Sequence, residues 1–477
     1  MFKRNHHYLE FLLLACVFSR VLTSIYYIED IDSLRFALSI QDYNILSLQP
    51  HFPGYPVFCF SAKLLHLIIG NMGVVFSIIG GFSIFFIIYY LLRVFNANLK
   101  SYEGQYIALL IFFNPLFWIM SNRYMPDLMG LATSLGAIYY LIFAHKQGRH
   151  LEKGFFISGI LSGIRLSYLP LLILPICKII FQSKDRLRFL LYFSVGVLVW
   201  LIPMIIITGF TDLVEIAQRH TAGHFLDYGG TIITEQSFSN RIIHLFRSVW
   251  ADGFGGYWIS RGWSSVLLSG LLLVQFSTSI GDIRKRWDRD NKLKILLFCI
   301  IIYTVWIILF QNVIFKSRHI LPVLLFFCIL LIEGQEKFRG RQYSAIIYCY
   351  FIILAGHNYT LVEQHRNHTA VHKLKNYISN KKNVESIISI PLINYYLERH
   401  KVSAKFVSVE DSSEIKNFST AYDSSKQVIM VGDYQSLLND TFISKTDTTF
   451  YHNPYMNQMW PKIQVYSIKR NSQYEIE

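Results

Sequence analysis

Charged residues are scarce in this chain. They make up 16% of its 477 residues, whereas soluble domains of ordinary composition carry about 25%. Hydrophobic residues make up 53%, and apolar runs of membrane-spanning length recur up to residue 360 or so. Backbone inside lipid must satisfy its own hydrogen bonds, so such runs form helices. The composition therefore argues against a soluble protein and predicts a polytopic α-helical membrane protein.

The chain also lacks paired cysteines, and its first apolar run does not have the pattern of a cleavable signal peptide. Its six cysteines form no CxxC pair, so neither a zinc site nor a disulfide framework is indicated. The first apolar run, Tyr8–Ile28, is longer than the core of a signal peptide and has no small-residue cleavage site. We expect an uncleaved first helix, and we find no internal repeat or low-complexity tract.

The apolar runs predict about eleven transmembrane helices. Lys and Arg gather in alternate connecting segments, with about 20 of them in roughly 60 residues, against about 10 in more than 100 residues on the other side. The positive-inside rule then places the N-terminus in the cytoplasm and the C-terminal end outside. This bias explains the net charge of +14 without a nucleic-acid partner. The expected spans are residues 8–28, 72–92, 104–120, 127–144, 154–166, 168–181, 188–208, 263–280, 293–312, 319–332 and 343–361.

Two domains are expected, a membrane domain over residues 1–361 and an extracytoplasmic domain over residues 362–477. The membrane domain has two long outer loops, residues 29–71 and 209–262. After residue 362 short apolar stretches alternate with polar ones, which is typical of a small α/β domain. Its expected strands are 384–390, 404–409 and 426–433, and its expected helices are 367–380 and 412–422.

The first outer loop holds the most unusual stretch, EDIDSLRFALSIQDYNILSLQPHFPGYP, from Glu29 to Pro56. The spacing of the apolar residues after Asp32 predicts a short amphipathic helix on the membrane surface, for which Asp32 could simply be the N-cap. Three prolines in QPHFPGYP exclude regular helix or sheet and predict a defined turn. Irregular backbone at this depth is tolerated where it lines a cavity. A carboxylate, His51 and Tyr55 are therefore expected to face one outer cavity.

These motifs, taken in order, resemble those of the GT-C glycosyltransferases. DSxxFAL and QPHxPGYP are similar to the first outer loop of the branch that contains protein O-mannosyltransferases and aminoarabinose transferases. NPLFW (Asn114–Trp118) with RYMPD (Arg123–Asp127), and KSRHILP (Lys316–Pro322), are similar to two later elements of that branch. The resemblance covers roughly residues 8–335 and implies a GT-C-like membrane fold.

The resemblance also implies a reaction. Its members transfer a sugar from a polyprenyl phosphate, here to a lipid, glycan or protein acceptor of the envelope, and an acidic residue of the first loop is the catalytic base. The motif places this role on Asp32. Asp30 is the alternative, because many relatives have Asp-Glu where this chain has Asp32-Ser33. Direct displacement would invert the sugar and requires only one carboxylate.

A departing phosphate gains charge, which fixed cations can stabilise. The candidates at outer membrane edges are Arg318, Lys316, His51 and Arg123. Arg318 is the best suited, since a guanidinium can bind a phosphate by two hydrogen bonds. The alternative is that these residues are interfacial anchors.

Four further residues are expected to shape the substrate site, namely Tyr55, Asp127, His319 and His224. Asp127 is expected to pair with Arg123, to contact the acceptor or simply to charge a helix N-terminus. Arg165 lies inside an apolar run, where a charge usually marks a functional cavity.

No metal site is assigned from the sequence. His220, His224 and Asp227 have a spacing that metal ligands can adopt, but surface polar residues are the simpler interpretation. Asp30-Ile31-Asp32 matches the DxD motif of soluble nucleotide-sugar transferases, yet it faces away from cytoplasmic nucleotides. A requirement for a divalent cation stays open.

The sequence thus predicts a multi-pass glycosyltransferase of the bacterial inner membrane that acts on a lipid-linked sugar. Three alternatives stay open: a transporter or flippase of a lipid-linked glycan, an enzyme like O-antigen ligase or polymerase, and a receptor-like protein. Asp32 discriminates between them, because only the GT-C interpretation makes it essential.

Overall fold

The computed structural model describes residues 6–144, 150–227, 229–234, 237–259, 261–287, 291–334, 341–367, 369–381, 383–410, 427–437, 442–451 and 462–470. The chain forms two compact units, Met1–Arg366 and Asn367–Glu477.

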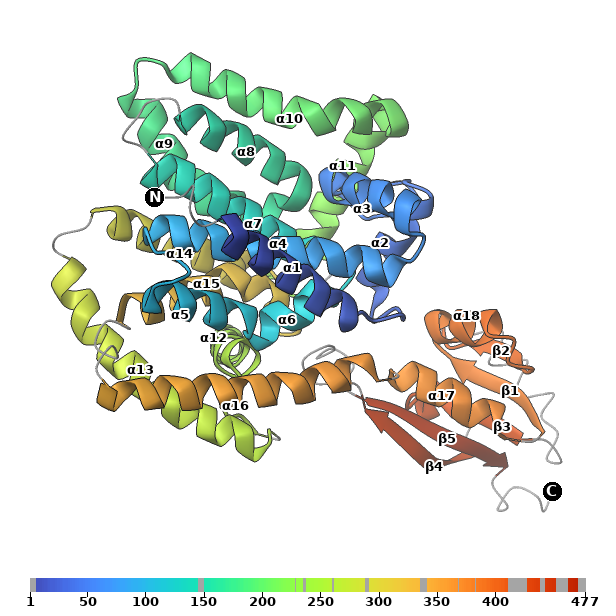
Figure 1. The fold of residues 1–477 in the computed structure, drawn as a ribbon. Helices are drawn as coiled ribbons and strands as arrows, with labels where there is room; N and C mark the ends of the chain where they lie inside the picture. The colour runs from blue at the N-terminus through green and yellow to red at the C-terminus, as the bar shows by residue number, and fades with distance from the viewer. Residues whose placement is uncertain are drawn as a thin grey trace. The chain divides into compact units, whose positions relative to one another are not determined.

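The first unit is built of helices (Figure 1). Several of them pass into a 3₁₀ or π turn, which carries the label η. In chain order its elements are α1 (His6–Leu22), α2 (Ile31–Gln41), α3 (Pro56–Ile69), α4 (Met72–Val94), α5 (Tyr102–Phe112), α6 (Pro115–Asn122), α7 (Asp127–Ile138), η2 (Tyr139–Phe143), α8 (His150–Arg165), η4 (Leu166–Leu172), α9 (Ile173–Gln182), α10 (Arg186–Thr208), α11 (Phe210–Leu226), α12 (Phe238–Arg247), η5 (Ser248–Gly253), α13 (Trp263–Trp287), α14 (Asn291–Phe310), η6 (Ser317–Ile320), α15 (Leu321–Gly334) and α16 (Arg341–Arg366).

Among the described residues, six helices are long and apolar enough to cross a membrane, and a bent pair brings the number up to seven. This supports a polytopic membrane protein, while the count of eleven stays a prediction. Two of the expected spans, 154–166 and 168–181, belong to one candidate span, His150–Gln182. The helix of the first expected span, 8–28, is shorter than predicted, because α1 already ends at Leu22.

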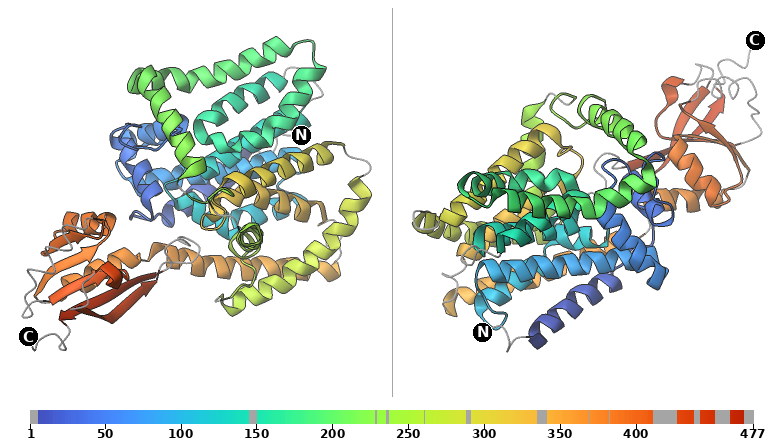
Figure 2. Two further views of the ribbon diagram at one scale, coloured as in Figure 1. Left: turned by 180° about the vertical axis from the view of Figure 1, so that it is seen from behind. Right: turned by 90° about the horizontal axis from the view of Figure 1, so that it is seen from above.

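Small residues allow some helices of this unit to approach closely. α8 and α10 pack side by side (Figure 2), and their glycines face one another. A Cβ atom on Gly159 would lie 2.3 Å from the carbonyl oxygen of Phe193, and one on Gly196 would lie 2.3 Å from that of Phe156. Such contacts replace the hydrophobic driving force that helices lack inside lipid.

The expected span 104–120 is broken where α5 and α6 meet at an angle of 54°. Asn114 caps α6 through its Oδ1, and Pro115 begins that helix. The buried Arg20 of α1 stabilises the break. Its Nη2 donates to the carbonyl oxygen of Phe112 at 2.7 Å, and its guanidinium lies 3.7 Å from the ring centre of Trp118.

The second unit contains a five-stranded sheet in the order β2-β1-β3-β5-β4. β1 pairs in parallel with β2 and β3, and β5 joins β3 to β4 in antiparallel pairing. The elements are α17 (Ala370–Ser379), β1 (Val384–Ser389), α18 (Pro391–Arg399), β2 (Lys405–Ser408), β3 (Gln427–Val431), η8 (Gln435–Leu437), β4 (Phe442–Tyr451) and β5 (Lys462–Arg470).

The small C-terminal sheet agrees with the sequence prediction in its first three strands and in α17. The helix expected at residues 412–422 lies outside the described residues. The sequence did not predict α18, β4 and β5. β4 carries polar residues on both of its faces, so it lacks the apolar–polar alternation by which a strand is recognised, and α18 follows β1 after a single residue. Apolar residues of α17 and α18 pack on the sheet beside Ile387, Ile429 and Val465.

We expect Arg20→Met to lower the free energy of unfolding by about 1–3 kcal/mol, because the buried carbonyl of Phe112 loses its donor. Thermal unfolding in detergent would measure the loss as a lower Tm. Arg186→Met is the matched control, since Arg186 is exposed at the start of α10. An equal loss in both variants would contradict the role given to Arg20.

Candidate functional site

The amphipathic helix expected in the first outer loop is confirmed as α2. Its N-cap is Asp30, whose Oδ1 accepts from the backbone nitrogen of Ser33 at 2.7 Å. Phe36 and Ile40 are buried on its inner face. The alternative that Asp32 caps this helix is therefore wrong. Asp32 lies in the first turn, and its side chain is free for other partners.

The turn QPHFPGYP ends at α3, which begins with Pro56. Its backbone is irregular, with Tyr55 in the left-handed region at φ 45°. Nε2 of His51 and the Tyr55 hydroxyl form a hydrogen bond of 3.0 Å. Both side chains also pack edge-on against Phe36 of α2. The turn therefore holds His51 and Tyr55 beside the helix that carries Asp32.

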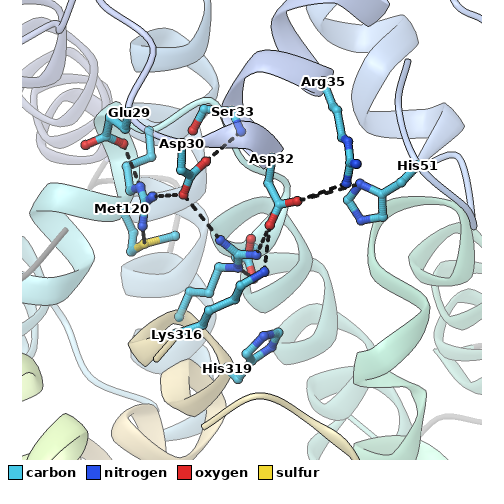
Figure 3. A network of polar contacts seen from close by, with 12 residues as sticks. Glu29, Asp30, Asp32, Ser33, Arg35, His51, Met120, Lys316 and His319 are labelled. Carbon is cyan, nitrogen blue, oxygen red and sulfur yellow. Dashed lines mark hydrogen bonds and ion pairs between the residues drawn. The ribbon is translucent and has the colours of Figure 1, made fainter. Parts of the chain in front are cut away.

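Asp32 is the centre of an ion-pair network (Figure 3) and is 6% exposed. Its Oδ2 accepts from Arg318 Nη2 at 2.5 Å and from Lys316 Nζ at 3.0 Å. Its Oδ1 lies 3.7 Å from Arg35 Nη1 and 4.0 Å from His51 Nδ1. The predicted base and three of the four predicted phosphate-binding residues thus lie together.

The fourth predicted cation, Arg123, lies behind Asp30. Its Nη2 donates to Asp30 Oδ2 and its Nε to Glu29 Oε2, both at 2.6 Å. The other Glu29 oxygen lies 2.7 Å from His365 Nε2. Asp30 also faces Arg318, whose Nη1 is 3.8 Å from Asp30 Oδ2. Arg123 therefore restrains the two carboxylates that precede α2.

Asp127 is fully buried at the start of α7 and pairs with Arg165 rather than with Arg123. Arg165 Nη2 lies 2.9 Å from Asp127 Oδ1, and Arg318 Nε lies 4.0 Å from the same oxygen. Arg165 also reaches Tyr55 Oη at 3.3 Å and His319 Nδ1 at 3.4 Å. Asp127 thus brings two guanidinium groups to the same place.

His224 lies on α11, where its Nε2 is 2.8 Å from the carbonyl oxygen of Phe310. It contacts the end of α14 there. Within the described part of the chain, no group of three or more His, Cys, Asp or Glu side chains is arranged to hold a metal ion. The spacing of His220, His224 and Asp227 therefore does not build a ligand set there.

The charges of the site determine its protonation. Burial alone would raise the pKa of Asp32, but Arg318 and Lys316 hold that pKa well below its usual range. In the same way, Arg123 and His365 outweigh burial and lower the pKa of Glu29. Burial lowers the pKa of His51 to about 3, so its ring is neutral at pH 7.

Burial also lowers the pKa of Lys316, as does the neighbouring Arg318, while Asp32 opposes the shift. Ion pairs join four carboxylates of the site to five cationic side chains, of which all but Arg35 come from distant elements. The cations are Arg35, Arg123, Arg165, Lys316 and Arg318. Fixed cations beside a buried carboxylate can bind a phosphate and also restrain a base.

Some members of this network were not among the predicted site residues, namely Glu29, Arg35, Arg165 and His365. Arg165 carried a signal, because a charge inside an apolar run is costly without a partner. Glu29 and Arg35 look like surface charges next to a span. His365 ends a long helix just before the second unit, and no local pattern connects it to Glu29.

The chain was compared with known proteins. No family model and no curated protein matches it, whereas nine chains of solved structures do. One is the crystal structure of ArnT from Cupriavidus metallidurans bound to undecaprenyl phosphate, with 10% identity over 98% of each chain and a TM-score of 0.51. The apo structure of ArnT has 11% identity over 97% of this chain and 98% of that one, with a TM-score of 0.42. At this identity the first likeness extends to the fold alone, and it supports a GT-C-like polytopic fold.

The Asp32 network should make stability depend on pH. Because the folded pKa is lowered, the ion pairs stabilise the protein above the ordinary Asp pKa of about 4, and this contribution is lost as pH falls through the lowered value. We expect Asp32→Asn to cost about 3–5 kcal/mol at pH 7. The difference in Tm from wild type should shrink on acidification.

Asp212→Asn is the control for this experiment, because Asp212 is exposed on α11. A Tm difference that stays constant from pH 7 to pH 3 for Asp32→Asn would contradict the network. A second check is Lys316→Met in the Asp32→Asn background. It should restore part of the loss, since it removes a cation that has lost its partner.

Proposed function

We propose that this protein is an integral membrane glycosyltransferase that moves a sugar from a polyprenyl phosphate to an acceptor of the bacterial envelope. The observation that carries the proposal is the Asp32 carboxylate, buried between Arg318 and Lys316. It lies in a chain whose fold is similar to that of ArnT, which was crystallised with undecaprenyl phosphate. A buried base next to phosphate-binding cations is what this transfer requires.

The donor phosphate would use the cations that now bind Asp32. Arg318 can present two parallel N–H groups to phosphate oxygens. The Lys316 side chain is 30% exposed, so its ammonium is within reach of a ligand. The phosphate and Asp32 then compete for the same donors. Binding of the donor would loosen the carboxylate from its ion pairs and raise its basicity.

The chemical step is a displacement at the anomeric carbon. The acceptor oxygen forms a bond to this carbon, the bond from the carbon to the phosphate oxygen breaks, and polyprenyl phosphate leaves with the electron pair. Asp32 takes the proton of the acceptor hydroxyl, a contribution of roughly 10²–10⁴-fold. The sugar is inverted. If the acceptor is itself a phosphate, Asp32 orients it instead.

Asp32 is a better base than Asp30 in this proposal. Asp30 already caps α2 through Oδ1 and binds Arg123 through Oδ2 at 2.6 Å, so both of its oxygens are engaged in holding the fold. Asp32 faces the cations directly. We assign Arg123 to holding Asp30 in place rather than to the donor phosphate.

The remaining predicted residues fit around this centre. Arg165, bound to Asp127, would add a second guanidinium beside the phosphate. Tyr55 and His51 would form the wall from the first loop, and His319 the wall from the turn that carries Arg318. His224 is left as a residue that holds α11 to the end of α14.

We further propose the topology that the charge bias predicts. The N-terminus is cytoplasmic, the site lies on the outer side, and the unit Asn367–Glu477 is extracytoplasmic, where it can guide an acceptor. The site would be near the outer surface because the reactive carbon of a polyprenyl phosphate sugar lies at the headgroup level.

Release of polyprenyl phosphate tests the function. The purified protein in lipid would be given a panel of polyprenyl phosphate sugars and an envelope extract as the source of acceptors. We expect turnover with one sugar, a fall of about 10²-fold or more in Asp32→Asn, and a comparable fall in Arg318→Ala. Asp212→Asn should keep wild-type turnover, and folding would be verified by Tm.

Other outcomes would favour the alternatives. A loss of turnover in Asp30→Asn but not in Asp32→Asn would assign the role of base to Asp30. If Asp32→Asn keeps its turnover and substitutions in the late loops abolish it, the result would favour an enzyme like O-antigen ligase. No release from any donor would contradict the proposal and favour a transporter or a receptor.

We expect chelation by EDTA to leave turnover unchanged. Arg318, Lys316 and Arg165 already supply positive charge at the proposed phosphate position, so the reaction has no need of a divalent cation. The measurement is the rate of polyprenyl phosphate release before and after dialysis against chelator. A rate that falls and is restored by Mg²⁺ or Mn²⁺ would contradict this expectation.

A further inference from the structure

The turn Lys316–His319 carries both cations that bind Asp32. It overlaps the short 3₁₀ helix η6 (Ser317–Ile320), whose N-cap is Lys316, and His319 N donates to the carbonyl oxygen of Lys316 at 3.2 Å. A 3₁₀ helix this short has poor hydrogen-bond geometry, so its shape depends on side-chain contacts. Lys316 and Arg318 are both turned to Asp32.

Ser317, between the two cations, is bound to a different part of the chain. Its Oγ donates to Oδ2 of Asp252 at 2.5 Å, and it lies 3.4 Å from Oγ of Ser248. The second Asp252 oxygen accepts from Arg261 Nη2 at 2.6 Å. Asp252 is fully buried. A buried carboxylate is costly unless it is paired, and this one is held between a guanidinium and a hydroxyl.

Asp252 is fixed in this position by the π-helical turn η5. The following residue, Gly253, allows η5 to lie directly on α15, because a Cβ atom there would be 2.6 Å from Leu324 Cδ1. η5 belongs to the second outer loop, and α15 is the helix that continues from η6. π-turns of this kind occur frequently at functional sites.

We propose that Asp252, acting through Ser317, is a positioning residue that holds Lys316 and Arg318 in the arrangement that binds the donor phosphate. The proposal rests on the proposed function. In the free protein Asp32 restrains the two cations. When a phosphate takes the place of that carboxylate, Lys316 and Arg318 are like charges on one short turn. Ser317 with Asp252 is then a restraint on the turn itself that stays, in addition to the contacts of Arg318 with Asp127 and Asp30.

Binding and turnover of the donor test this role separately. We expect Ser317→Ala to raise the Kd for undecaprenyl phosphate and the KM for the donor about tenfold, the loss of one hydrogen bond to a charged group. kcat should change by less than about twofold, since the reacting atoms are untouched. Ser317→Thr, which keeps the hydroxyl, should restore binding.

Asp252→Asn provides a second perturbation of the same contact. We expect it to weaken binding in the same direction, and the double variant with Ser317→Ala should be no weaker than the worse single variant. Ser83→Ala is the matched control. Ser83 is also buried, but its hydroxyl donates to the carbonyl oxygen of Ile79 in its own helix.

Three results would overturn the role of Asp252. They are unchanged binding in both Ser317→Ala and Asp252→Asn, fully additive losses in the double variant, and an equal loss in Ser83→Ala. If Asp252→Asn does not fold, Ser317→Ala alone decides. A wild-type protein that neither binds undecaprenyl phosphate nor releases it from any donor overturns the proposed function itself, and the role of Asp252 with it.

Discussion

Pairing of buried charges is the constraint on which the helical unit depends. Asp32 and Asp127 are almost fully removed from solvent, and neither would be stable there as an isolated ion. Their partners, Arg318 and Arg165, come from distant elements. The ion pairs therefore hold α2, α7, α8 and the start of α15 at one point. The same contacts that keep these elements together form the candidate site.

There is a chemical advantage when the same ion pairs stabilise the fold and form the candidate site. Cations that are already fixed by carboxylates need little reorganisation when an anion of similar shape arrives. Arg318 is restrained by Asp32 on one side and lies near Asp127 on the other. Ser317 and Asp252 hold the same turn from behind. The side chains around a phosphate would thus be placed before the phosphate binds.

Much of this arrangement could be predicted from local pattern. α2 follows from apolar spacing, the turn after it from its prolines, and β1 to β3 from short apolar runs. Arg123 was expected to bind phosphate, but the structure places it against Glu29 and Asp30. Such pairings join segments far apart in the sequence, and a single sequence read by itself gives no sign of them. The number of spans was also hard to predict, since breaks such as the one at Asn114 turn one apolar run into two helices.

The distance along the chain between Asp32 and Arg318 has a consequence for biosynthesis. The two residues are 286 positions apart, so α2 is made long before the turn that carries its partners. At the usual rate of synthesis, roughly 5–20 residues per second, Asp32 is made tens of seconds before Lys316 and Arg318. A nascent chain therefore has no assembled site. Any product truncated before residue 316 would keep Asp32 beside Arg35 but without the two cations that bind its Oδ2, so its site would be incomplete.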